Sequence, residues 1–182
     1  GKTAAFLIPM INKGMLDSSQ RFLIVVPTRE LAMQIQDEFM QLARNTGMRS
    51  VLIMGGNSMG KQIGVLKRDP NFVIATPGRL KDLVGRKAID LLRINNVVLD
   101  EVDRMLDMGF IEDIRFIISK LNEKKQSLFF SATMNKKSEE IANTLLKRPV
   151  KIHVEEEVRG KNVDQDVIRL KDGENKFDVL CE

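Results

Sequence analysis

The sequence predicts an α/β fold with a mostly parallel central sheet flanked by helices. Short apolar runs alternate with longer amphipathic segments, which is the pattern of consecutive strand–helix–strand units. Several runs, such as 72–75, are apolar at every position, as strands buried on both faces require. Glycine, hydroxyl, arginine or acidic residues follow five of the runs, and open α/β sheets bind ligands at the carboxyl ends of their strands.

Six strands are expected, at residues 21–26, 51–54, 72–75, 96–100, 127–130 and 150–154. Four helices are expected, at 3–13, 30–46, 110–121 and 136–147. Leu31, Ile35 and Phe39 share one face of the second helix, Thr28 is placed to cap it, and Gly47 to end it.

The last part of the chain, from residue 155, does not continue the alternation of strands and helices. The charged stretch 155–163 contains Gly160 and is typical of a linker. Residues 164–170 are expected to form a fresh strand, and 174–182 the first turns of another helix. One domain is therefore predicted over 1–154, and the start of a second over 164–182.

Composition narrows the class of protein. Hydrophobic residues make up 43% and charged residues 30%, which is ordinary for a globular domain. Cys181 and His153 are single in the sequence, so neither an internal disulfide nor a zinc site is expected. No apolar run approaches the ~20 residues of a membrane span, so no membrane partner is expected. We expect a cytoplasmic protein, or a nuclear one in a eukaryote.

The run 97–99 ends in acids at positions 100, 101 and 103. A strand's carboxyl end is where a nucleotide-hydrolysing enzyme places a carboxylate for Mg²⁺ and another that activates water. Taken alone, this pattern equally suits an exposed strand end with solvated charges. A second signal is needed.

That second signal opens the chain, where Gly1-Lys2-Thr3 matches the last three residues of the phosphate-loop pattern. The lysine of this pattern neutralises phosphate charge, and the hydroxyl binds Mg²⁺. Alone, the tripeptide could also begin an ordinary amphipathic helix. In combination with the acids at 100–103, it points to ATP.

Nine further candidates follow the first three strands and are suited to a phosphate backbone by their hydroxyls, arginines and closely approachable glycines. They are Pro27, Thr28, Arg29, Gly55, Gly56, Thr76, Pro77, Gly78 and Arg79. Ser131 and Thr133 follow the fifth strand, and their hydroxyls are placed to bond the carboxylate of Asp103. The net charge of +4 permits nucleic-acid binding, and the absence of Trp and Tyr favours gripping the backbone over stacking on bases.

In their order and spacing, these segments resemble the DEAD-box RNA helicase family over nearly the whole chain. The similarity links 1–3 to motif I, 27–32 to motif Ia, 55–56 to the GG doublet, 76–79 to motif Ib and 131–133 to motif III. Residues 100–103 stand where the family has its DEAD tetrad, with Val102 in place of alanine. The resemblance implies a RecA-like P-loop NTPase domain of an ATP-dependent RNA helicase, which remodels or locally unwinds RNA.

The resemblance also implies residue roles. Gly1, Lys2 and Thr3 would bind ATP, with Thr3 and Asp100 holding Mg²⁺, while Glu101 would orient or deprotonate the attacking water. Catalysis would thus depend on Glu101, Asp100 and Lys2. Asp103, Ser131 and Thr133 would couple nucleotide to RNA, and the nine candidates after the first three strands would hold the RNA backbone.

Other parts of the family's machinery are expected outside the chain: the first strand with the front of the phosphate loop, and the second RecA-like domain with its arginine finger. We therefore expect this fragment alone to hydrolyse ATP weakly or not at all. We also expect the protein to be a monomer. Two alternatives stay open. One is a DNA-directed helicase of the same superfamily, and the other is a non-catalytic RNA-binding scaffold.

Overall fold

The computed structural model of the chain describes residues 2–153, 170, 175 and 177. Its backbone contacts divide the chain into two units, Gly1–Arg148 and Pro149–Glu182, and the candidate site residues belong to the first. The predicted linker at 155–163 lies outside the described residues. So do the predicted strand at 164–170 and helix at 174–182, apart from three single positions.

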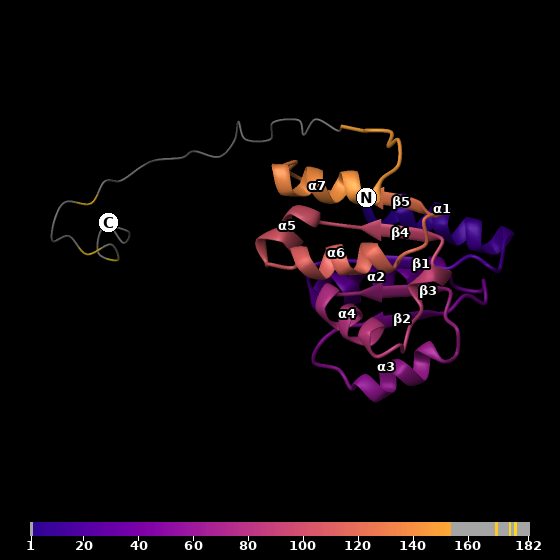
Figure 1. Cartoon of the computed structure of the whole chain (residues 1–182). Helices are drawn as coiled ribbons and strands as arrows, with labels where there is room; N and C mark the ends of the chain where they lie inside the picture. Colours follow the sequence, from indigo (N-terminus) through magenta and orange to yellow (C-terminus); the bar gives the residue numbers. More distant parts are fainter. Residues whose placement is uncertain (1, 154–169, 171–174, 176, 178–182) are drawn as a thin grey trace. The chain divides into compact units, whose positions relative to one another are not determined.

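Five short strands, all parallel, form one sheet. They are β1 (Phe22–Val25), β2 (Ser50–Ile53), β3 (Phe72–Ala75), β4 (Asn96–Leu99) and β5 (Gln126–Phe129). Their order across the sheet is β2-β3-β1-β4-β5 (Figure 1). The predicted fold class is therefore confirmed, and five of the six predicted strands are present within two residues of their expected ends.

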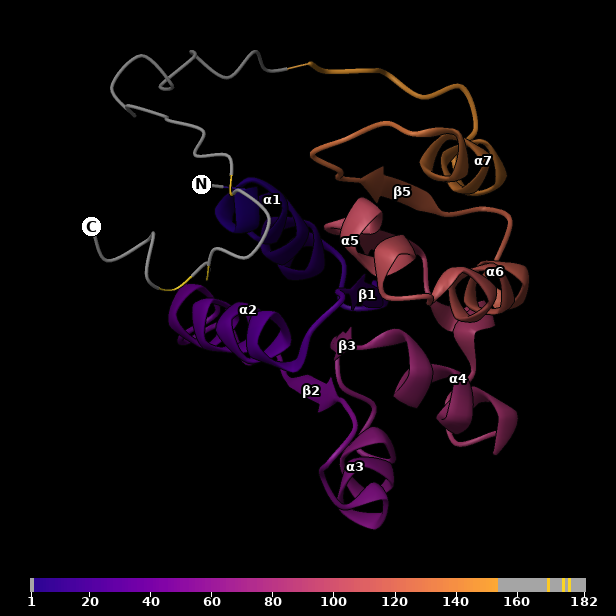
Figure 2. The same ribbon diagram turned by 90° about the vertical axis from the view of Figure 1, so that its left-hand side faces the viewer.

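Helices cover both faces of the sheet. In chain order they are α1 (Lys2–Leu16), α2 (Arg29–Leu42), α3 (Met59–Leu66), α4 (Pro77–Gly85), α5 (Val102–Asp107), α6 (Ile111–Lys120) and α7 (Lys136–Leu145), with a 3₁₀ turn η1 (Leu91–Arg93) before β4. Figure 2 shows α1 and α2 on one side of the sheet and α4, α5 and α6 on the other. The domain is thus a three-layer α/β structure.

Each face of the sheet carries its own apolar core. On the side of α1 and α2, Phe22 stacks on Phe72 with ring centroids 4.3 Å apart, and Phe39 packs against Phe72 at 4.6 Å. On the opposite side, Leu80, Met105 and Ile114 of the covering helices are fully buried. Because β1, β3 and β4 are buried at every position, they are held between these cores as rigid supports for the residues that follow them.

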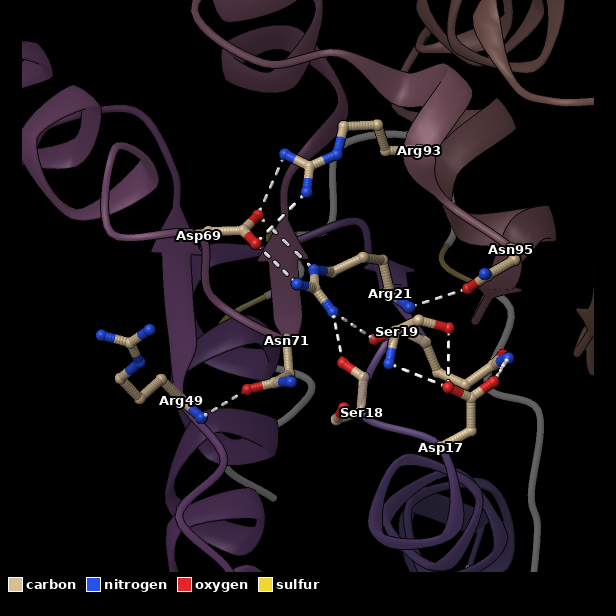
Figure 3. A network of polar contacts seen from close by, with 10 residues as sticks. Asp17, Ser18, Ser19, Arg21, Arg49, Asp69, Asn71, Arg93 and Asn95 are labelled. Carbon is tan, nitrogen blue, oxygen red and sulfur yellow. Dashed lines mark hydrogen bonds and ion pairs between the residues drawn. The ribbon is translucent and has the colours of Figure 1, made fainter.

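A polar network ties the amino ends of the strands together (Figure 3). Asp69 accepts from Arg21 at 2.5 Å and pairs with Arg93 at 3.1 Å. Its backbone takes the left-handed conformation, with φ of 50°, which Asp tolerates better than most side chains. The loop before β3 is thereby joined to the start of β1 and to η1.

The prediction of a sixth strand at 150–154 is wrong for residues 150–153, which are the part of it that the structure describes. Residues 150–153 form no regular element, and Val150 and Ile152 are 88% and 84% exposed. Apolar alternation alone does not make a strand, because a strand needs a neighbour for its backbone groups, and these four residues pair with none in the described part of the chain.

Three helices, α3, α4 and α5, are absent from the prediction. At α4, where no helix was expected, Pro77 takes the first helical turn, where its missing N–H costs nothing. The predicted helix 30–46 ends early, at Leu42, because Asn45 and Gly47 turn the chain through left-handed conformations. None of the helices in the described part of the chain has the length and apolarity needed to cross a membrane.

Candidate functional site

The strand ends are aligned across the sheet, and this alignment builds the site. The last residues of the strands are mutual register partners: Ile53, Ala75, Val25, Leu99 and Phe129. The segments that follow therefore meet at a single carboxyl edge, as the sequence predicts. Strand order divides this edge into an acidic half after β4 and β5, and a half after β1, β2 and β3 that carries arginine, glycine and hydroxyl groups.

Asp100 is the centre of the acidic half. It follows β4 directly and is 3% exposed. Lys2, the first residue of α1, holds its ammonium 3.7 Å from Asp100 Oδ1, and the Glu101 N–H donates to the same oxygen at 3.0 Å. Oδ2 receives no hydrogen bond from the described residues. The structure thus brings together two residues that lie 98 positions apart in the sequence.

Burial decides the protonation behaviour of Asp100. Desolvation raises the pKa of this carboxyl above its ordinary value, and the nearby Lys2 ammonium only partly offsets the rise. The carboxylate therefore gains from any cation brought to this edge.

Glu101 has an unusual backbone. It is the N-cap of α5 and lies in the left-handed region, with φ of 53° and ψ of 51°. For a residue with a long side chain, this conformation costs on the order of 1–3 kcal/mol, and strain of this kind clusters at functional sites. The Glu101 carboxylate contacts Arg104 at 3.2 Å and is 30% exposed, so it stays accessible at the edge.

Asp103 joins the ends of β4 and β5. Its Oδ2 accepts from the Thr133 N–H at 2.9 Å and from the Thr133 hydroxyl at 3.0 Å. The Ser131 hydroxyl accepts from the Asp103 N–H at 3.3 Å and donates to the Thr133 carbonyl at 2.7 Å. Partial burial raises the pKa of Asp103, but the hydrogen bonds from Thr133 outweigh it and leave the pKa below its ordinary value.

In the other half, Arg29 lies over Gly56. Gly56 has φ of 81°, and a Cβ there would stand 2.5–2.9 Å from the guanidinium atoms of Arg29. Only glycine leaves room for this stacking. Thr28 caps α2 by accepting from the Leu31 N–H at 3.2 Å, so the first turn of α2 holds Arg29 in place.

A second arginine ties two loops of this half together. Arg79 donates to the carbonyl of Asn57 at 3.0 Å, which links the start of α4 to the loop after β2. Thr76 is the N-cap of α4 and is 8% exposed, while Gly78 is exposed beside it. Pro27 and Pro77 are buried and shape the turns.

The sequence reasoning missed two contributors. The Asn57 carbonyl, which accepts from Arg79, has no sequence signal except its position next to the glycine pair. Arg104 lies three residues after Glu101, a spacing that brings the two side chains together only on a helix, and that helix was not predicted. Gly1 lies outside the described residues. Within residues 2–153, no group of three His, Cys, Asp or Glu side chains could hold a metal ion, so a cation at Asp100 would need oxygens from a ligand or water.

The family model described as DEAD/DEAH box helicase matches residues 1–141, and the chain belongs to this family. The resemblance drawn from the motifs is thereby confirmed.

Individual relatives support this family assignment. The DEAD-box ATP-dependent RNA helicase CshA of Streptococcus pneumoniae is 43% identical over 182 residues, covering 99% of this chain and 34% of the relative. RhpA of Helicobacter pylori is 45% identical over 154 residues, covering 85% of this chain and 31% of the relative. The crystal structure of a DEAD box protein from Methanococcus jannaschii matches with a TM-score of 0.77 and 38% identity, over 81% of this chain and 40% of that one. The chain spans about a third of the length of these curated relatives.

Proposed function

We propose that this chain is the motor domain of an ATP-dependent RNA helicase, which binds ATP and the RNA backbone at the carboxyl edge of its sheet. The observation that carries the proposal is the pairing of Lys2 with buried Asp100, beside the bridge from Asp103 to Thr133. The family and the names of its relatives support ATP as the nucleotide and RNA as the polymer.

On this proposal, Lys2 contacts the β- and γ-phosphates of ATP. Its side chain is 58% exposed and lies at the amino end of α1, where free backbone N–H groups and the helix dipole also favour phosphate. Glu101 orients or deprotonates the attacking water, because its carboxylate is accessible at the edge beside Asp100.

Mg²⁺ fits this donor set. Asp100 has a buried carboxylate whose Oδ2 receives no donor from residues 2–153, and Thr3 supplies a hydroxyl next to Lys2. We propose that Thr3 and Asp100 hold the cation together with phosphate oxygens and water. When bound, the ion would supply positive charge to the phosphates.

RNA is proposed to lie along the other half, against Thr28, Arg29, Gly56, Thr76 and Arg79. These residues offer a cation, a hydroxyl or a close backbone, and the described part of this half presents no exposed aromatic ring for stacking. Contact with the backbone alone predicts little sequence specificity and a steep loss of affinity with salt.

The contact between Asp103 and Thr133 is proposed to couple the nucleotide site to bound RNA. It lies next to Glu101 and spans the adjacent strands β4 and β5. A shift of the carboxylates when nucleotide binds would therefore be felt at the loop after β5.

The test is ATP hydrolysis with single-stranded RNA, with single-stranded DNA and with neither. It is made on a polypeptide that joins this domain to its second RecA-like domain, because the resemblance assigns the arginine finger to that domain. We expect stimulation by RNA and little by DNA. Stimulation by DNA would indicate a DNA-directed motor, and RNA binding without any hydrolysis would indicate a scaffold.

A further inference from the structure

A hollow lies far from the candidate site, near the amino ends of the strands. It is an open depression with a volume of about 550 Å³. It is bordered by the end of α2 with the turn that follows, the start of β2, and the end of α3 with the residues after it. Phe39, which is 2% exposed, Ala43 and Met48 give it an apolar floor. Met40 and Val65, at 53% and 36% exposed, continue this apolar surface to the rim.

Three arginines, Arg44, Arg49 and Arg68, also line the hollow, and all three are exposed. Among residues 2–153, no carboxylate lies within 4 Å of their guanidinium groups. Two other arginines at this end of the domain, Arg21 and Arg93, share the single carboxylate of Asp69. The hollow therefore concentrates positive charge that the domain itself does not compensate.

Figure 3 makes the contrast visible. The Arg49 backbone N–H donates to the Asn71 side chain at 3.1 Å, while the Arg49 guanidinium points away from the network around Asp69. The backbone of Arg49 is thus fixed, and its charge is left for another molecule.

The hollow also holds an unsatisfied acceptor. Gln36 donates from Nε2 to the Ser50 hydroxyl at 2.9 Å, but its Oε1 is buried with no donor in the described part of the chain. A buried acceptor without a donor is unfavourable, and a small shift of the Gln36 amide would let it accept from a backbone N–H of a bound peptide.

We propose that this hollow docks a short acidic peptide segment of a partner protein. One apolar side chain of the segment would cover Phe39, Met40 and Met48, while carboxylates on either side would meet Arg44, Arg49 and Arg68. Charge complementarity favours an acidic partner, and the apolar floor favours a peptide over a nucleic-acid backbone, which has no apolar group to place there. Because the candidate ATP and RNA site lies at the opposite edge of the sheet, docking leaves that site open.

The test begins with a displayed library of random dodecapeptides selected on the whole protein. We expect the enriched peptides to combine Asp or Glu with a large apolar residue. The best of them is then synthesised, labelled and titrated against the wild type and two double variants with the same change in net charge. Arg49→Glu with Arg68→Glu alters the hollow, whereas Lys61→Glu with Lys67→Glu alters exposed residues of α3 and its end that do not line it.

The arginine double variant is expected to bind the peptide about tenfold more weakly, and the lysine double variant as the wild type does. Thermal melts confirm that both fold, and RNA-stimulated ATP hydrolysis stays unchanged in both, which separates this proposal from the proposed function. Failure to enrich acidic peptides, or equal affinity in both variants, would overturn it. Loss of RNA binding in the arginine variant, with RNA displacing the peptide, would instead make the hollow a nucleic-acid site.

Discussion

Asp100 is a carboxylate held where its own charge destabilises the domain. Burial raises its pKa, and the Lys2 ammonium compensates only in part. A raised pKa in the folded state means that the ionised form costs stability at neutral pH, and that this cost disappears as the pH falls toward the ordinary Asp value. The domain retains the charge because the proposed chemistry requires it.

Asp100→Asn is therefore expected to stabilise the domain by about 1 kcal/mol at pH 7 while abolishing ATP hydrolysis. The stability gain should shrink as the pH is lowered from 7 to 4, since the wild-type carboxyl then becomes neutral as well. Thermal melts of the variant and the wild type between pH 7 and pH 4 measure this change in stability. Asp37→Asn, at an exposed position of α2, serves as the control and should change neither stability nor hydrolysis. An Asp100→Asn variant less stable than the wild type at pH 7 would contradict the account.

Gly56 provides a second test at the scale of one residue. Gly56→Ala forces a left-handed conformation on alanine and displaces the Arg29 guanidinium, so RNA affinity should fall about fivefold with a stability loss of about 1 kcal/mol. Gly55→Ala is the matched control, because a Cβ at that neighbouring glycine meets nothing within 4 Å. Salt-dependent RNA binding by both variants measures the difference. If Gly55→Ala weakens RNA binding as much, the placement of Arg29 over Gly56 is not what matters.

Between elements, hydrogen bonds and ion pairs set the positions of loops. The Thr133 hydroxyl joins the loop after β5 to Asp103 at the start of α5. Thr133→Val keeps the shape and removes this bond. We expect ATP hydrolysis without RNA to change little and stimulation by RNA to fall about tenfold. Thr133→Ser, which keeps the hydroxyl, should restore stimulation. Equal stimulation in the valine variant and the wild type would show that the bridge is only structural.

At the other end of the sheet, Asp69 fastens β1, β3 and η1. The hydrogen bond from Arg21 is the main reason why the pKa of Asp69 lies below its ordinary value, so its stabilising effect is present above the ordinary Asp pKa and is lost as pH falls through the folded-state pKa.

Asp69→Asn is expected to lower stability by about 1 kcal/mol at pH 7, a modest value because both partners are partly exposed. Asparagine tolerates the left-handed backbone, so the loss reports charge and not strain. Chemical unfolding at low and high salt checks this, since salt should reduce the difference. A loss that is unchanged by salt would point to the hydrogen-bond geometry instead.

Much of the sheet and its carboxyl edge was predictable from local pattern. Buried parallel strands such as 72–75 are apolar throughout, and the residues that follow them stand out against those runs. Short helices were not predictable from local pattern. For example, α5 has Glu101 as its N-cap in a strained left-handed conformation, and the sequence there contains no capping pattern that predicts a helix. The strand order, the ion pair between Lys2 and Asp100 and the hollow near Arg49 depend on residues distant in sequence, which no local pattern encodes.

For the molecule as a whole, the central claim is that the acidic half of the edge hydrolyses ATP in response to RNA bound on the other half. Glu101→Gln isolates this claim, because the amide keeps the size of the side chain but cannot take a proton from water. The most direct measurement is single-turnover ATP hydrolysis with saturating RNA, on the two-domain polypeptide, with ATP affinity measured in parallel.

The account predicts that Glu101→Gln binds ATP and RNA as the wild type does but hydrolyses about 10²–10⁴-fold more slowly. Hydrolysis at the wild-type rate, or a loss of ATP binding that accounts for the whole decrease, would contradict it.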